Sequence, residues 1–277
     1  MKIGIFAKTF PGTDPYTVLA ACKTAGFEAA QYNMSCSGLD PLPALISDEA
    51  ADLVKSASHA AEIEIAAVSA TYNMTDPDET RREAGRRSFA SIAGAAKRMG
   101  TNLVTVCSGS KDPHSQWQHH PANNDPASWM EMCREIEFIL RLAEQHDLMI
   151  GVEPEQANVV SSPRKAARLL DEFSGSRLRV VLDPANILEG VPANLRQPTI
   201  DEALDLLGPA VALAHAKDRF PDGRVAPAGL GVVDWGHFLR GLASIGCCKH
   251  LIVHGILPNE APLVASFLGG ELNKKTR

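Results

Sequence analysis

Four side chains that could bind a metal ion follow short apolar segments in the second half of the chain: Glu153, Asp183, His215 and His254. Carboxylates and imidazoles together are good ligands for Mn²⁺, Fe²⁺, Co²⁺ or Zn²⁺. A single aspartate in such a place is more often a helix cap or a turn residue. Four residues of this kind at the ends of successive strands favour a metal centre instead, because buried carboxylates are costly without a cation.

The positions two residues before these four side chains are all small or apolar: Gly151, Val181, Leu213 and Ile252. Residues i and i+2 of a strand face the same side of the sheet. We therefore expect both sets of side chains to point into one barrel, with the candidate ligands at the carboxyl ends of the strands.

Short β-type segments alternate with helical segments along the whole chain. The predicted strands are residues 2–6, 28–33, 64–70, 102–107, 148–153, 178–183, 211–216 and 250–254. Helical patterns begin near Tyr16 and Ser47, and a short final helix is expected from about Asn259 to Leu268. This alternation predicts an α/β fold with parallel strands and right-handed crossovers, a single (β/α)8 TIM barrel. A doubly wound open sheet is the alternative, although the first βα turn lacks a G-x-G-x-x-G motif.

Composition restricts the classes of function. The net charge of -6 argues against a nucleic-acid or anionic-membrane partner, and no apolar run approaches the length of a membrane span. The opening "MKIGIF" does not resemble a signal peptide, and six cysteines without C-x-x-C spacing indicate free thiols in a reducing compartment. We therefore expect a cytoplasmic enzyme. No linker divides the sequence, so residues 1–277 are expected to form one domain.

Two predicted βα loops are longer than a connection requires, namely residues 108–126 and 217–233. Both lie on the side where barrel enzymes carry their chemistry, and loops of this length are usually lids or binding loops. Trp117 could stack on the apolar face of a ring, with a solvated loop as the alternative. The other ring-bearing residues of the first loop are His114, His119 and His120.

Asn73 and Cys107 end the third and fourth predicted strands and should line the same pocket. A packed thiol is a better interpretation of Cys107 than a nucleophile. Lys217 could neutralise an oxyanion or a phosphate, or it could pair with Asp218 at the rim. Glu155 is not expected in the pocket, because Pro154 interrupts the strand that precedes it.

A run of arginines lies on the helix that follows the third predicted strand, interspersed with Glu79 and Glu83. Opposite charges at helical spacing are typical of a solvated face, and we interpret the run in this way. The arginines are Arg81, Arg82, Arg86 and Arg87.

Several segments resemble the sugar phosphate isomerase/epimerase family, the xylose-isomerase-like TIM barrels. They are "IGVEPEQANVV", "VVLDPANIL", "LAHAKD" and "AGLGVVDWGHFLRGL". The family's metal ligands are a Glu, an Asp, a His and a second Glu on strands five to eight. The first three map onto Glu153, Asp183 and His215, but His254 stands where the family usually has the second Glu. Asn186 stands where many relatives have a substrate-contacting His.

The resemblance implies a divalent-metal-dependent isomerase or epimerase that acts on a keto sugar, a sugar phosphate or a cyclitol derivative through an enediolate. One ion per chain is expected, Mn²⁺ first, with Zn²⁺, Co²⁺ and Mg²⁺ as alternatives. Glu153 would be both ligand and base, while His254 would be the fourth ligand or an acid or base. Glu260 is an alternative fourth ligand. The expected substrate-binding residues are Asn73, Cys107, Trp117, Asn186 and Lys217.

Three other functions stay open at this point. A metal-dependent lyase or dehydratase acting on a keto sugar or cyclitol would use the same enolate chemistry. A non-catalytic sugar- or metal-binding barrel and a relative of the apurinic-site endonucleases fit less well. The endonucleases need additional histidines where this chain has Asn73, Cys107 and Asn186. A small-molecule carbohydrate is the expected partner, and the sequence does not determine an oligomeric state.

Overall fold

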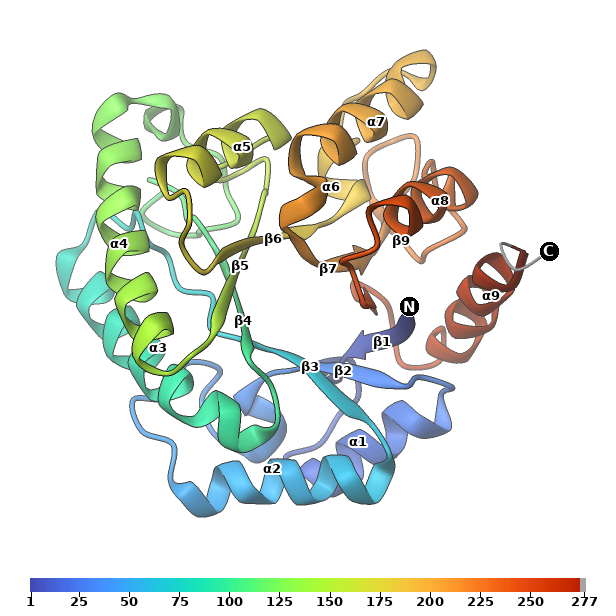
Figure 1. Cartoon of the computed structure of the whole chain (residues 1–277), viewed down its shortest axis with the longest axis horizontal. Helices are drawn as coiled ribbons and strands as arrows, with labels where there is room; N and C mark the ends of the chain where they lie inside the picture. The colour runs from blue at the N-terminus through green and yellow to red at the C-terminus, as the bar shows by residue number, and fades with distance from the viewer. Residues whose placement is uncertain (275–277) are drawn as a thin grey trace.

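The computed structural model describes residues 1–274 and shows a closed barrel of parallel strands surrounded by helices (Figure 1). The strands follow one another round the barrel in chain order, and β1 pairs with β10 to close it. They are β1 (Lys2–Phe6), β2 (Ala29–Tyr32), β3 (Glu64–Ser69), β4 (Leu103–Cys107), β5 (Met149–Glu153), β6 (Leu178–Leu182), β7 (Val211–Ala216) and β10 (His250–Val253). The predicted (β/α)8 TIM barrel is confirmed.

The helices lie outside the strands. They are α1 (Pro15–Thr24), α2 (Asp48–Ala61), α3 (Glu79–Met99), α4 (Pro126–Gln145), α5 (Pro163–Glu172), α6 (Pro184–Ile187), α7 (Arg196–Leu207), α8 (Trp235–Ile245) and α9 (Ala261–Asn273). The predicted end of the last helix at Leu268 is wrong, since α9 continues through Gly269 and Gly270. Each glycine costs about 1 kcal/mol in a helix. Leu272 packs against the core beyond them, which offsets this cost.

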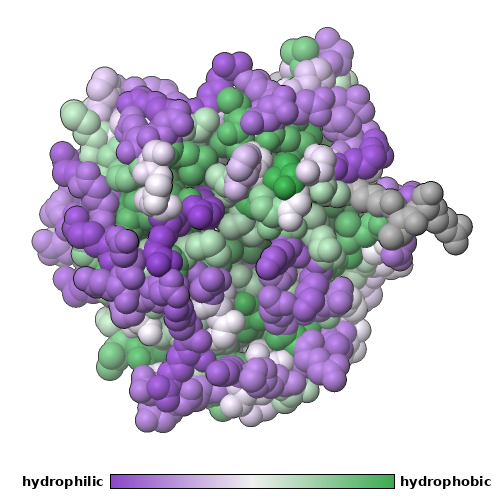
Figure 2. Space-filling model, in the orientation of Figure 1, coloured by the Kyte–Doolittle hydropathy of each residue, from purple (hydrophilic) through white to green (hydrophobic). Residues whose placement is uncertain are grey.

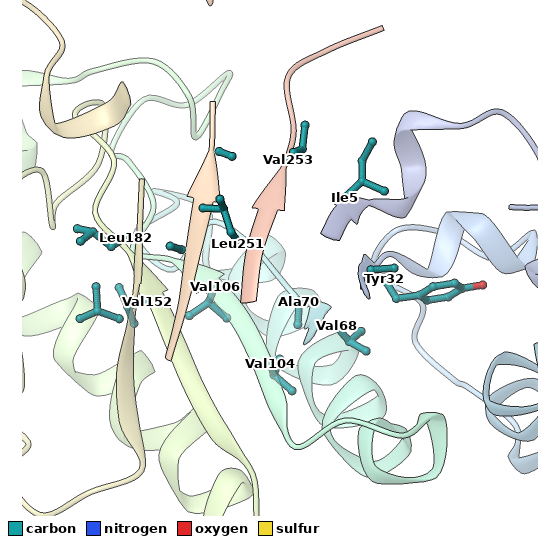
Figure 3. Packing of buried hydrophobic residues seen from close by; sticks show 14 of the residues in the cluster. Ile5, Tyr32, Val68, Ala70, Val104, Val106, Val152, Leu182, Leu251 and Val253 are labelled. Carbon is teal, nitrogen blue, oxygen red and sulfur yellow. The ribbon is translucent and has the colours of Figure 1, made fainter. Parts of the chain in front are cut away.

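Alternation along the strands separates the two sides of the barrel wall, as predicted. Val181, Leu213 and Ile252 form a buried cluster inside the barrel. A Cβ atom on Gly151 would lie 2.8 Å from Cγ2 of Val181, so this interior position has room only for glycine. The intervening residues face the helices and form the larger core, in which Figure 3 labels Val152, Leu182, Leu251 and Val253 among others.

The interpretation of the arginine run on α3 as a solvated face is wrong for two of its members. Arg86 Nη2 lies 2.5 Å from Oε1 of Glu135, whose side chain is buried on α4, and Tyr72 donates a hydrogen bond to the same carboxylate at 2.8 Å. Arg82 pairs with Glu131 at 2.9 Å. A buried carboxylate needs a partner of this kind, and these pairs join α3 to α4.

Hydrophilic residues dominate the periphery of the face shown in Figure 2, as expected for the outward sides of the helices. Within residues 1–274, no helix combines the length and the hydropathy that a membrane span requires.

Candidate metal centre

The barrel brings all four candidate ligands together. Glu153, Asp183, His215 and His254 each offer one ligand atom, and these atoms lie within 4.8 Å of one another. The side chains come from the carboxyl ends of β5, β6, β7 and β10, which are neighbours in the barrel. Such a spacing would allow one ion to contact all four atoms, with Asp183 and His215 buried and the other two partly accessible.

Asp183 both caps a helix and belongs to the ligand cluster, the two roles that its sequence position left open. Its Oδ1 caps α6 by accepting hydrogen bonds from the backbone N–H groups of Ala185 at 2.8 Å and Asn186 at 3.4 Å. Its Oδ2 faces the cluster, 3.1 Å from His254 Nε2 and 2.9 Å from Lys217 Nζ. Burial opposes ionisation, but Lys217 and the two histidines hold the pKa of Asp183 well below its usual value. The carboxyl is therefore an anion.

His215 is oriented by a residue that the sequence analysis missed. Gln31 on β2 donates through Nε2 to Thr105 Oγ1 at 3.0 Å, which leaves its Oε1 to accept from His215 Nε2 at 2.9 Å. A neutral imidazole that donates through Nε2 presents a lone pair at Nδ1. This Nδ1 lies 3.1 Å from Glu153 Oε1. Two facing acceptors repel unless a proton or a cation lies between them, so the pair suits a metal ion.

His254 lies against His215, with ring centroids 4.5 Å apart. Burial, reinforced by the neighbouring imidazole, lowers the pKa of His254 below its usual value and so favours the neutral ring that a metal ligand must have. Glu153 also has a lowered pKa, which in a carboxyl group favours the charged form. Burial opposes its ionisation, but His215 holds the pKa of this carboxyl below its usual value.

Asn186 joins the cluster to a second carboxyl group. Its Nδ2 donates to Glu153 Oε1 at 2.9 Å and to Glu155 Oε2 at 2.7 Å, while its Oδ1 accepts from Lys217 Nζ at 2.5 Å. The expectation that Pro154 would turn Glu155 away from the pocket is wrong, because Glu155 lines the cavity. Burial raises the pKa of Glu155 to about 7, although Lys217 opposes this shift.

A cavity of about 760 Å³ opens beside the ligand cluster. Cys107, Trp117 and Lys217 line it, together with Glu153 and Glu155. Burial raises the pKa of the Cys107 thiol well above its usual value, and the two carboxyl groups reinforce the shift. The thiol is therefore protonated and suited to packing rather than to nucleophilic attack. Trp117 is 56% exposed, so its ring is available at the mouth.

Two other residues considered from the sequence lie elsewhere. Asn73 uses its side chain to hold the backbone of Ser110, to which it donates at 2.9 Å and from which it accepts at 2.9 Å. Glu260 Oε2 accepts from the backbone N–H of Leu257 at 2.7 Å and lines a different cavity. Neither side chain belongs to the ligand cluster found within residues 1–274.

The two long loops have different internal supports. In residues 108–125, Asn123 is buried and binds Ser110 and the backbone of Lys111, so these bonds brace the loop from within. The loop after β7 contains a hairpin of β8 (Asp218–Arg219) and β9 (Val225–Ala226), which the sequence analysis did not predict. Buried Asp218 accepts hydrogen bonds from the N–H groups of Gly229, Val233 and the Trp235 indole. It therefore holds this loop and does not pair with Lys217.

The model of one protein family, described as xylose isomerase-like TIM barrel, matches residues 19–266 of the chain. No curated protein matches the sequence. Many solved structures share the fold.

Three of these structures illustrate the range. The apo 3-keto-D-glucoside 4-epimerase YcjR from E. coli has a TM-score of 0.75 at 16% identity, over 98% of this chain and 99% of its own. The probable 3-DHS dehydratase AsbF from Bacillus anthracis has a TM-score of 0.74 at 15% identity, over 99% of both chains. A xylose isomerase-like TIM barrel protein from Mycobacterium smegmatis, solved in complex with magnesium, has a TM-score of 0.68 at 13% identity, over 94% of this chain and 88% of its own. These likenesses concern the fold.

Proposed function

The chain belongs to the xylose isomerase-like TIM barrel family, and from this premise we propose that it is a divalent-metal-dependent isomerase or epimerase. The substrate class would be a keto sugar, a sugar phosphate or a cyclitol derivative that presents a hydroxyl group beside a carbonyl. One observation carries the proposal: four metal-ligating atoms converge within 4.8 Å at the end of a cavity large enough for a sugar.

Glu153, Asp183, His215 and His254 would hold the ion, for which Mn²⁺ is the first candidate. The donor set suits it, because two carboxylates from β5 and β6 combine with two imidazoles from β7 and β10. When bound, a divalent cation supplies positive charge that acidifies the C–H beside a carbonyl and stabilises the enediolate. The fold class includes a magnesium complex, so Mg²⁺ is a second candidate alongside Zn²⁺ and Co²⁺.

We assign proton abstraction to Glu153, whose carboxylate lines the cavity and is held in place by Asn186. Glu155 binds the same Asn186 nitrogen, so the two carboxyl groups lie on one side of the cavity. Return of the proton by Glu155 would reach the face from which it was taken, as an isomerase requires. An epimer would require return of the proton to the opposite face, a role open to His254 only where it does not hold the ion.

A lyase or dehydratase is the second candidate, and the imidazole at the end of β10 favours it. Symmetric epimerisation uses matched bases on opposite faces, whereas dehydration needs one base for the proton and one acid for the departing hydroxyl group. Glu153 would take the proton, and a protonated group at the cavity would complete the release of water. The dehydratase among the similar folds belongs to this reaction class.

The test combines metal analysis with hydrogen exchange. Mn²⁺-loaded protein is incubated in D₂O with a panel of ketoses and followed by proton NMR. We expect one ion per chain and deuterium at the carbon beside the carbonyl. A product of unchanged composition identifies an isomerase or epimerase, and loss of water identifies a lyase.

Asp183→Asn and Asp183→Ala should lose the ion and the exchange while circular dichroism stays unchanged. The asparagine variant keeps an acceptor for the α6 amides. Glu260→Gln is the matched control, since this carboxylate lies outside the cluster, and it should keep both properties. Full metal occupancy in both Asp183 variants would overturn the proposal.

A further inference from the structure

The cavity beside the metal centre has two chemically different walls. The ligand cluster lies on β5, β6, β7 and β10, which are adjacent in the barrel. β1 and β2 lie directly across the barrel from β5 and β6. Lys8 and Thr9, which follow β1, and Asn33, which follows β2, line the cavity opposite Glu153 and Asp183, on the side where β1 pairs with β10. A substrate bound at the ligand cluster would therefore extend towards these three residues.

Lys8 brings a charge that no carboxylate neutralises. Lys8 and Lys217 are the only lysines among the described residues that line the cavity, and no arginine lines it. Lys217 is buried in its ion pair with Asp183, whereas Lys8 forms no ion pair with any residue in 1–274. Its Nζ lies 4.7 Å from the centroid of the Phe6 ring, which also lines the cavity. The ring attracts the ammonium group without neutralising it.

The residues beside Lys8 add neutral donors. Asn33 is buried, and its Oδ1 accepts from the backbone N–H of Ser35 at 3.1 Å and from the Ser35 hydroxyl at 2.7 Å. These two bonds fix the amide so that its Nδ2 donors are left for another acceptor. Thr9 adds a hydroxyl group. An ammonium group, an amide NH₂ and a hydroxyl group are the donors that an anionic oxygen group requires.

We propose that the substrate carries an anionic oxygen group, either a phosphate ester or a carboxylate, at the end remote from its hydroxy-ketone, and that Lys8, Thr9 and Asn33 bind this group. The inference rests on the proposed function, because it takes the hydroxy-ketone to face the ligand cluster. The inference also gives Lys217 and Lys8 different roles. Lys217 serves the metal end, where its partners already occupy it, and Lys8 selects the distal end of the substrate.

The test compares three ketoses by titration calorimetry on the Mn²⁺-loaded protein. D-fructose 6-phosphate carries a phosphate ester, 5-keto-D-gluconate carries a carboxylate, and D-fructose carries neither. We expect at least one of the anionic compounds to bind about tenfold more tightly than D-fructose, with a preference that weakens as salt is added. The tighter of the two anionic compounds identifies the source of the negative charge.

Variants then test which residue causes the preference for an anionic ketose. Lys8→Met should bring the ratio of Kd values for D-fructose and the tighter anionic ketose close to one, and Lys8→Arg should restore it. Lys249→Met is the matched control, an exposed lysine at the opposite end of the barrel, and it should keep the wild-type ratio.

Equal Kd values in the wild type, or an unchanged ratio in Lys8→Met, would overturn this inference and leave the proposed function standing. Failure of all three ketoses to bind a protein that retains its metal would also overturn this inference, whereas full metal occupancy in both Asp183 variants would overturn the proposed function.

Discussion

The two ends of the barrel carry similar titratable side chains, yet only one end concentrates them. His250 and His254 lie four residues apart on and just after β10. At the amino end, His250 Nε2 pairs with Glu64 Oε1 at 3.0 Å, and Lys2 binds the same carboxylate at 2.8 Å. Glu64 and Lys2 are both about half exposed, so water shares in solvating this group.

At the carboxyl end, water is largely excluded. The Asp183 side chain is inaccessible to solvent and that of Glu153 is 14% exposed. Lys217 is the buried ammonium group that pairs with Asp183. Two carboxylates and two imidazoles therefore share one small volume. Residue type does not distinguish the two ends of the barrel. The difference lies in burial and in the number of ligand atoms that meet, and these two features make one end a candidate metal centre.

The largest difference between the two ends should appear in activity. Glu155→Gln keeps the hydrogen bond from Asn186 but removes a carboxyl group from the cavity, and we expect the rate of isomer formation to fall by about 10²- to 10⁴-fold. Metal content should stay at one ion per chain. Glu64→Gln, the matched change at the amino end, should leave the rate unchanged. An active Glu155→Gln enzyme would show that this carboxyl group only fills space.

The second largest effect is expected from loss of the hydrogen bond between Gln31 and His215, which should weaken metal binding. Gln31→Leu removes the acceptor that fixes the tautomer of His215, and the loss of such a partner typically costs about 10- to 100-fold in metal affinity. Competition with a metal-binding dye would measure the change. Thr105→Val, which only loosens Gln31, should have a smaller effect. If both variants bind metal like the wild type, another group orients the imidazole.

The pH dependence of metal binding distinguishes His250 at the start of β10 from His254 just after its end. A ligating imidazole must be neutral, so metal affinity falls as the pH drops through the imidazole range, about 6.5 before burial lowers it. Glutamate ionises nearer about 4.3, so His254→Glu should hold metal several-fold more tightly than the wild type at pH 5.5. His250→Gln should leave the pH profile unchanged. Equal affinities of His254→Glu and wild type at pH 5.5 would place His254 outside the ligand set.

The smallest effect is expected at the amino end. Glu64→Gln weakens an exposed ion pair, and such pairs contribute about 0–1 kcal/mol to stability. Burial opposes the ionisation of Glu64, but Lys2 and His250 hold its pKa below the usual value. This contribution is therefore present at neutral pH and is lost as the pH falls through the folded-state pKa. Urea unfolding at pH 7 and pH 3 measures it, and a loss above about 2 kcal/mol would contradict the exposed character of the pair.

The strands and the four candidate ligands could be predicted from the sequence because alternation is a local property. The four apolar strands of the second half each end in a ligand-type residue on the side that faces the barrel, and Gly151 and Val181 mark that side. Gln31 carried a similar signal that went unused. Gln31 and Asn33 are polar residues two apart at the end of a predicted strand, so both face the interior.

Other parts of the site depend on contacts that periodicity does not encode. Glu155 reaches the cavity because the chain turns after Pro154, where the N–H of Glu155 binds the carbonyl of Val160 at 3.1 Å. The pairing of Lys217 with Asp183 rather than with its sequence neighbour Asp218 depends on two strands that meet only in the folded barrel. The arginines of α3 looked solvated for the same reason, since Glu135 lies on the next helix.

Anomalous diffraction from a crystal of the Mn²⁺-loaded protein tests the central claim most directly. The account predicts one strong peak at the carboxyl end of the barrel, about 2.0–2.3 Å from single atoms of Glu153, Asp183, His215 and His254. A peak without His254 in contact would revise the ligand set, whereas the absence of any peak between Glu153 and His215 would contradict the metal centre itself.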